Sequence, residues 1–358
     1  MRKLLILTLV GGLLFLNSGY AFAGDRRELT MQQAVEMAWN HSSALRAAGY
    51  NIEKSKYDRD AAADKVEYTP TGQASPEAEI AFNNLVQADI NWQAAKKNYQ
   101  AQQDSIRLSV YQAYCSILQN QAMVESAREA VYNAELQYRA AQLSYQVGSG
   151  SKWNVQQKQN DLVLARSDLA AAQKTLEDSY MKFNQLLGLS LDERPQLVEQ
   201  PAYSPFSVAS LEAEVSRVLD ESPTVWQARQ SVTQARIALD IYSFSNSEAH
   251  TYDSMETSVS IAEQNAKSAE EKAAQTVRSL YNSIQQLEQT RAGLVQKLEK
   301  ARNDLLMTEA KFKNGTANKL ELAAARYAVV QVQKSLLDTD CQHAILVEAF
   351  KTPWAYGG

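Results

Sequence analysis

Few residues in this sequence combine the side-chain types and the spacing that catalysis or metal binding requires. The three histidines, His41, His250 and His343, lie far apart in the chain, and none has a second ligand at the short spacing typical of metal sites. The sequence contains no phosphate-binding loop, nucleophile elbow or HExxH motif, and the Gly-Ser-Gly at 148–150 is typical of a turn. We therefore expect no catalytic activity, no cofactor and no metal site.

The two cysteines, Cys115 and Cys341, are the remaining reactive groups. An exported protein could join them in a disulfide. Both lie within helical patterns, at positions that have no evident relation in the sequence. We therefore expect two buried residues that behave as small apolar side chains.

The composition is typical of long helices rather than of a domain with a large aromatic core. Hydrophobic residues make up 45% of the 358 residues, but aromatic residues only 8%. The net charge of −5 lacks the basic surplus that a polyanion-binding protein carries. Nucleic acid is therefore excluded as an expected partner.

The first residues have the parts of a secretory signal. A positively charged start is followed by an apolar stretch at 4–16, and the small residues Ala21 and Ala23 mark a cleavage site. The apolar stretch is short for a membrane-spanning helix. We expect 1–23 to be removed as a signal peptide and the mature chain to be exported, with a retained membrane anchor as the alternative.

Glycine and proline, the strongest helix breakers, divide the rest of the chain into long uninterrupted segments. Proline is absent between 77 and 194 and again between 224 and 352. Apolar residues recur at helical spacing within these segments. We predict an all-α fold with little or no β-structure, and helices at 29–40, 43–64, 77–146, 152–187, 208–220, 223–242, 256–313 and 319–350.

The longest segment carries a seven-residue repeat of large apolar residues, including Val110, Ile117 and Val124. A sustained repeat of this length indicates supercoiled helices that pack along their whole length. At 1.5 Å per residue, 77–146 is about 105 Å long, so two shorter antiparallel helices placed end to end can line it. Leu143 lies off this seam, and copies of the chain could cover such residues by closing into a hollow ring. A solitary elongated bundle is the alternative.

The chain contains two copies of one helical unit. The stretch "ELTMQQAVEMAWNHSSALRAA" at 28–48 aligns with "SLEAEVSRVLDESPTVWQAR" at 210–229. A glycine break between two long helices also occurs once in each unit. The division that we predict is a first repeat at 24–207, with its turn near 147–151 and a connector at 188–207, and a second repeat at 208–358, with its turn near 314–318.

These paired openings, together with the paired turns "LSYQVGSGSKWNVQQKQNDLVLARSDLAAAQ" and "AKFKNGTANKLELAAARYAVVQVQKSLL", resemble the TolC-like outer-membrane efflux proteins. The resemblance covers nearly the whole mature chain and lies in the duplication, the order and the spacing of the segments. It implies a homotrimer whose antiparallel helical hairpins form an α-barrel tunnel. It also implies that the tips of the hairpins meet a periplasmic adaptor protein and an inner-membrane pump.

By this resemblance, the two glycine turns are the tips that contact the adaptor. The residues concerned are Val147 and Gly148 in the first repeat and Asn314 and Gly315 in the second. The alternative is that each turn only reverses the chain and has no partner.

The resemblance also implies an aperture just beyond the tips, where members of this family often carry acidic residues. Glu321 lies six residues after Gly315 and is acidic, whereas Asn154, six residues after Gly148, is polar but uncharged. Three copies of Glu321 would form a ring that favours cations. A surface glutamate with no gating role is the alternative.

The sequence departs from the family at the opposite end. The family inserts a β-hairpin into each repeat, and a membrane-spanning strand needs about 9–11 residues. The loops at 65–76 and 243–255 are too short for such hairpins, and neither alternates apolar and polar residues. We therefore expect no full transmembrane barrel, which argues against direct insertion into the outer membrane that the resemblance implies.

The sequence thus favours a TolC-like channel component of a tripartite efflux or type I secretion system, in the cell envelope. The alternative function is an elongated coiled-coil spacer or scaffold of the envelope that encloses no channel. A hollow trimer would indicate the channel, and a solid dimer or a monomer would indicate the spacer.

Overall fold

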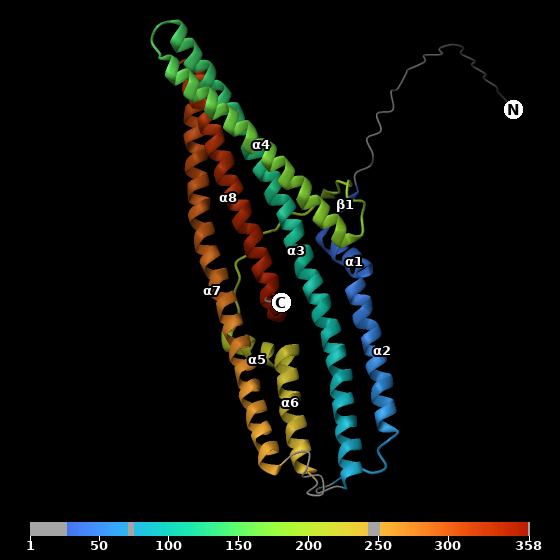
Figure 1. The fold of residues 1–358 in the computed structure, drawn as a ribbon. Coiled ribbons are helices and arrows are strands. Elements are labelled where there is room, and N and C mark those ends of the chain that lie inside the picture. Colours follow the sequence, from blue (N-terminus) through green and yellow to red (C-terminus); the bar gives the residue numbers. More distant parts are fainter. Residues whose placement is uncertain (1–26, 71–74, 243–250, 357–358) are drawn as a thin grey trace, which may run out of the picture.

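A computed structural model of the chain describes residues 27–70, 75–242 and 251–356, and Figure 1 shows them as a long, narrow arrangement of helices. Strands occur in this part of the chain only as one short pair. The elements are β1 (Glu28–Leu29), α1 (Met31–His41), α2 (Ser43–Ala63), α3 (Pro76–Gln146), α4 (Lys152–Leu187), β2 (Gln196–Leu197), α5 (Leu211–Glu221), α6 (Pro223–Asp240), α7 (Tyr252–Lys313), α8 (Lys319–Lys351) and the 3₁₀ helix η2 (Pro353–Ala355).

Helix boundaries follow the capping residues in the sequence. A side-chain oxygen of Ser75 accepts a hydrogen bond from the Ala78 N–H at the start of α3, and Pro76 occupies the first helical position. The α7 helix starts at Tyr252, four residues earlier than predicted, because Thr251 caps it in the same way. The predicted all-α fold is confirmed, and the helix ends differ from the prediction by only a few residues.

Each long helix is lined by two shorter helices that run antiparallel to it (Figure 1). In the first repeat α2 and α4 pack on α3, one beyond the other, and α1 lies at the junction between them. In the second repeat α6 and α8 pack on α7 in the same manner. The stacking predicted from the helix lengths is therefore confirmed in both repeats.

The two repeats meet along α3. This helix packs against α8 over one part of its length and against α6 over another. The α3 and α8 helices run in opposite directions. The start of α8, next to the second glycine turn, therefore lies beside the half of α3 that leads to the first glycine turn (Figure 1). The two repeats thus form a single layered bundle rather than two separate domains.

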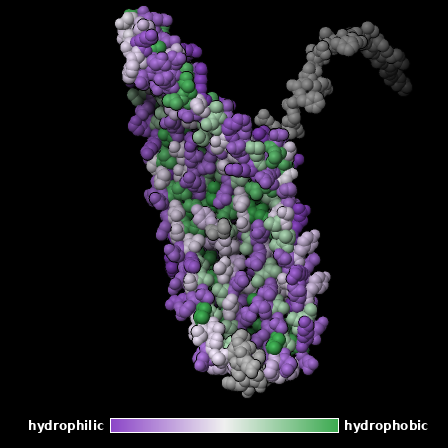
Figure 2. All heavy atoms as spheres, in the orientation of Figure 1, coloured by the Kyte–Doolittle hydropathy of each residue, from purple (hydrophilic) through white to green (hydrophobic). Residues whose placement is uncertain are grey.

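The core lies near the middle of the molecule, where the short helices of each repeat meet the long ones. The seam residues Val110 and Ile117 are completely buried, and Val124 is nearly so. Toward the tip the same seam opens, and Tyr145 is half exposed. Figure 2 shows hydrophobic side chains gathered along the middle of one face and hydrophilic ones toward the tip.

A short parallel pair of strands, which the sequence did not predict, joins the residues just before α1 to the connector at 188–207. Glu28 pairs with Gln196 and Leu29 with Leu197. The Tyr114 hydroxyl, on α3, accepts a hydrogen bond from the Glu199 N–H at 3.1 Å beside this pair. Strand pairing over such a large sequence separation depends on the packed core, so no local pattern reveals it.

The two short loops expected at 65–76 and 243–255 fall partly on residues 71–74 and 243–250, which lie outside the described residues. The predicted signal peptide at 1–23 lies outside them as well. Within the described part of the chain, no helix combines the length and the apolar character that crossing a membrane would require.

Candidate functional site

The first glycine turn reverses the chain by a left-handed residue. Gly148 has φ of +77°, which glycine adopts without the steric penalty that other residues meet. Its N–H donates to the Tyr145 carbonyl at 3.0 Å, and the N–H groups of Ser149 and Gly150 both donate to the Ser144 carbonyl at 2.9 Å. These bonds satisfy the last carbonyls of α3 and end the helix sharply.

The second turn has the same construction. Gly315 has φ of +72°, and its N–H donates to the Phe312 carbonyl at 3.1 Å. The N–H groups of Thr316 and Ala317 both donate to the Lys311 carbonyl, at 2.9 and 3.2 Å. The two turns are therefore the same motif used once in each repeat, as the duplicated sequence predicts.

The four residues predicted to contact an adaptor lie at the outermost points of these turns. Val147 is 77% exposed although it is apolar, and Asn314 occupies the equivalent position at the end of α7. A side chain added at either glycine would meet nothing within 4 Å, so both turns have free space around them. In the single chain, both turn glycines are therefore exposed.

The two aperture candidates are equivalent: Asn154 is the third residue of α4, and Glu321 is the third residue of α8. The Asn154 N–H donates to the Ser151 hydroxyl at 3.1 Å at the start of α4. At the start of α8, the Glu321 carboxylate accepts from the Asn318 N–H at 3.0 Å, and the Glu321 N–H donates to the Asn318 side chain at 2.9 Å. Glu321 thus completes a capping box, in addition to any role of its charge.

The tips do not lie at the same height. The Lys319 ammonium, at the start of α8, lies 6.0 Å from the centre of the Tyr132 ring on α3. From Tyr132 the α3 helix continues to Gln146 before it turns, which at 1.5 Å per residue adds about 20 Å. Figure 1 shows the α3–α4 hairpin extending beyond the α7–α8 hairpin.

Large apolar side chains are exposed on the outer halves of both hairpins. Leu143 on α3 and Leu164 on α4 are 62% and 63% exposed, and Leu306 and Met307 on α7 are 67% and 58% exposed. Scattered single leucines are normal at a surface, but a succession of them along two hairpins is typical of a surface that packs against another chain. The sequence already indicated such a surface, because Leu143 lies outside the seven-residue apolar repeat of its helix.

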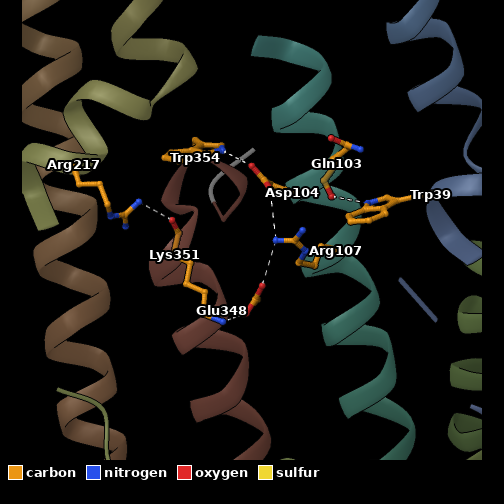
Figure 3. A network of polar contacts seen from close by, with 8 residues as sticks. All are labelled: Trp39, Gln103, Asp104, Arg107, Arg217, Glu348, Lys351 and Trp354. Carbon is orange, nitrogen blue, oxygen red and sulfur yellow. Dashed lines mark hydrogen bonds and ion pairs between the residues drawn. The ribbon is translucent and has the colours of Figure 1, made fainter. Parts of the chain in front are cut away.

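A network of charged residues joins the two repeats near the middle of the molecule (Figure 3). Arg107 on α3 lies 3.9 Å from both Asp104 and Glu348, and Glu348 on α8 also pairs with Lys351 at 2.6 Å. The Trp354 indole N–H in η2 donates to the Asp104 carboxylate at 3.1 Å. We call Asp104, Arg107, Glu348, Lys351 and Trp354 the polar junction.

Two further contacts extend the polar junction to α1 and α5 (Figure 3). The Arg107 guanidinium lies 5.3 Å from the centre of the Trp39 ring, whose N–H donates to the Gln103 carbonyl. Arg217 on α5 donates to the Lys351 carbonyl at 3.2 Å. Sequence reasoning missed this network, because its members look like ordinary surface charges until the helices bring them together.

Burial raises the pKa of one member of the polar junction. Removal of Asp104 from water raises its pKa, an effect that Glu348 reinforces and that the Trp354 hydrogen bond and the Arg107 charge oppose. The carboxylate of Glu348, only 6% exposed, is held by two cations, so the buried charge is compensated.

A second set of polar contacts, centred on the partly buried Glu288, attaches the connector to α7 and α8. The Phe206 N–H donates to the Glu288 carboxylate at 2.6 Å, and the same carboxylate lies 3.2 Å from His343. The Tyr203 ring packs between His343 and the Arg291 guanidinium, at 5.2 and 3.7 Å. His343 is therefore a structural residue of the core.

The described part of the chain contains no cluster of three residues that could hold a metal ion. His41 lies at the end of α1, and His250 lies outside the described residues. Of the histidines that the structure describes, neither His41 nor His343 belongs to a cluster that could hold a metal ion.

The chain matches the family model described as "Outer membrane efflux protein" over residues 81–189 and 209–351, which together form most of its length. The two matched segments leave out the connector between the repeats. No curated protein matches the sequence significantly.

Several solved structures have the same fold. The chain superposes on the outer-membrane channel OprN with a TM-score of 0.66 at 14% identity, covering 92% of this chain and 90% of that one. For CusC the TM-score is 0.65 at 16% identity, covering 92% of this chain and 92% of that one. For VceC from Vibrio cholerae the TM-score is 0.64 at 14% identity, covering 91% of this chain and 96% of that one. From the family match over most of its length, we conclude that this chain belongs to the outer membrane efflux protein family.

Proposed function

We propose that three copies of this chain assemble into a hollow helical tunnel, which serves as the channel of a tripartite efflux or type I secretion system. As a member of its family, the protein is a channel component of the cell envelope and not an enzyme. The homotrimer, the tunnel and the partners at its tips are what the proposal adds.

The exposed apolar residues on the outer hairpins carry the proposal. In one chain Leu143, Leu164 and Leu306 remain in contact with water, although burying each leucine would contribute about 2 kcal/mol. They lie on helices of both repeats, so contacts with neighbouring copies would cover apolar surface on both hairpins. Head-to-tail packing of a chain with itself gives a ring when the rotation between neighbours closes, which is the arrangement that we propose for three copies.

The experiment that tests the proposal is a measurement of the assembly. We expect purified full-length protein in mild detergent to have the mass of a trimer by light scattering and to appear as a hollow ring in end-on electron micrographs. A solid dimer or a monomer with ordered hairpins would overturn the tunnel and would support the envelope spacer instead.

The tips are the surface at which we propose that an adaptor docks. A photoreactive amino acid placed at Val147 or at Asn314 should form a cross-link to a single envelope protein in living cells. The same reagent at Tyr57, which is 70% exposed on α2 far from the tips, is the matched control. Equal cross-linking at Tyr57, or none at the tips of an assembled trimer, would argue for turns that have no partner.

Glu321 is the residue through which we propose that the aperture selects by charge. The variant Glu321→Gln removes the charge but keeps a side chain that can complete the capping box, so α8 should start normally. We expect it to reduce the passage of cationic dyes relative to neutral ones in cells, with no loss of trimer. An unchanged ratio would leave Glu321 a capping residue only.

A further inference from the structure

Cys115 and Cys341 lie side by side in the core, although 226 positions separate them in the sequence. Both side chains are completely buried, and the Cys341 sulfur lies 4.0 Å from the Cys115 carbonyl oxygen. The expectation that both are buried is confirmed. The expectation that their positions are unrelated is wrong, because α3 of the first repeat packs against α8 of the second.

Contacts on either side show that the two cysteines occupy facing positions of an antiparallel helix pair. Toward the tip, Gln119 on α3 donates to the Asp338 carbonyl on α8 at 3.4 Å. Away from the tip, Arg107 on α3 pairs with Glu348 on α8. Residue numbers that increase along α3 therefore pair with residue numbers that decrease along α8, and Cys115 faces Cys341 in this register.

We propose that Cys115 and Cys341 form a disulfide bond in the exported protein, which joins the first repeat covalently to the second. The structure holds them as free, buried thiols on facing turns of α3 and α8. Family membership places the protein in the cell envelope, where thiols meet oxidising conditions and facing cysteine pairs become disulfides. The proposal does not depend on the trimer or on the tunnel.

The step is a two-electron oxidation by thiol–disulfide exchange with an envelope oxidoreductase that carries a reactive disulfide. One cysteine thiolate attacks that disulfide, and the second displaces the oxidoreductase from the mixed intermediate. Each cysteine loses a proton, the Cys115–Cys341 bond forms, and the oxidoreductase leaves as a dithiol. The Cys115 thiol and burial raise the pKa of Cys341, so we expect the bond to form before the core closes.

The first experiment traps the thiols in cells. Full-length protein is denatured in acid, treated with N-ethylmaleimide without reductant, and analysed by mass spectrometry. We expect exported protein to take up no reagent and to be lighter by two hydrogen atoms than its reduced form. A version without residues 1–23, kept in the cytoplasm, should take up the reagent at both cysteines. Reagent on both cysteines of the exported protein would overturn the proposal.

The second experiment separates a disulfide from two packed thiols. If the bond forms, Cys115→Ala, Cys341→Ala and the double variant should lower the melting temperature by similar amounts, because breaking the bond once removes its whole effect. Reductant should lower the melting temperature of the wild type and leave the double variant unchanged. Additive losses with no effect of reductant would contradict the proposal, and the result is independent of the oligomeric state.

Discussion

Asp104 shows how one residue can acquire a role that its sequence context hides. In the sequence it is a single acid in a polar helical stretch, and in the structure it lies between Arg107 and the Trp354 indole, with 18% of its side chain exposed. The partners come from distant parts of the chain. Only the packing of α3 against α8 and η2 reveals the polar junction.

The raised pKa of Asp104 predicts a pH dependence of stability. Because its pKa in the folded protein is above the ordinary value of 3.8, the folded state holds this proton more tightly than the unfolded state. The contribution of Asp104 to the free energy of unfolding therefore falls as the pH rises from about 3.8 through the raised pKa, and increases as the pH is lowered again.

The variant Asp104→Asn removes this dependence and keeps an acceptor for the Trp354 N–H. We expect the melting temperature of the wild type, relative to that of the variant, to increase as the pH is lowered from neutral toward 4. Circular dichroism measures both melting temperatures. Asp58→Asn is a suitable control, because Asp58 is an exposed member of a surface pair with Lys54. A constant difference between wild type and Asp104→Asn over this range would contradict the prediction.

At the scale of the helices, glycine ends three of the long elements, but the three positions differ in their surroundings. Gly148 and Gly315 stand free at the tips, whereas Gly188 ends α4 directly beside α1. A side-chain carbon added at Gly188 would lie 2.3 Å from the His41 ring nitrogen. Positive φ makes glycine preferable at all three, and crowding adds to this at Gly188 alone.

These differences predict an order of stability losses. Gly148→Ala should lower the free energy of unfolding by about 1–2 kcal/mol, the usual penalty for a left-handed alanine. Gly188→Ala should lower it by more, because the His41 ring must move. The additional loss at Gly188 should disappear when the effect of Gly188→Ala is measured in a protein that already carries His41→Ala. Thermal or denaturant unfolding measures both losses. An equal loss in the two backgrounds would mean that the ring moves aside freely.

The helices themselves were predictable because their signals are local. Pro76 and Pro223 start helices, Gly148 and Gly315 end them, and the apolar spacing between these breaks has a single period. Both tips and the pairing of short with long helices follow from these signals and from length. The β1–β2 pair and the polar junction were not predictable, because they exist only through contacts between distant segments.

At the scale of the molecule, the exposed leucines predict which substitutions prevent assembly. Leu306→Glu should abolish or strongly reduce the proposed trimer, because it would bury a charge in the interface proposed between copies. Gln296→Glu introduces the same charge at an exposed polar position of the same helix and should leave the trimer intact. Light scattering on both variants measures the effect, and equal behaviour would place the interface elsewhere.

The unequal reach of the two hairpins has a consequence for whatever meets the end of the molecule. With the α3–α4 turn about 20 Å beyond the α7–α8 turn, a ring of such chains would end in an uneven rim, in which longer and shorter hairpins alternate. A flat partner would contact only the longer α3–α4 hairpins. A partner whose own hairpins project between them would also contact the α7–α8 turns, and the α3–α4 hairpins on either side would fix its rotation about the axis.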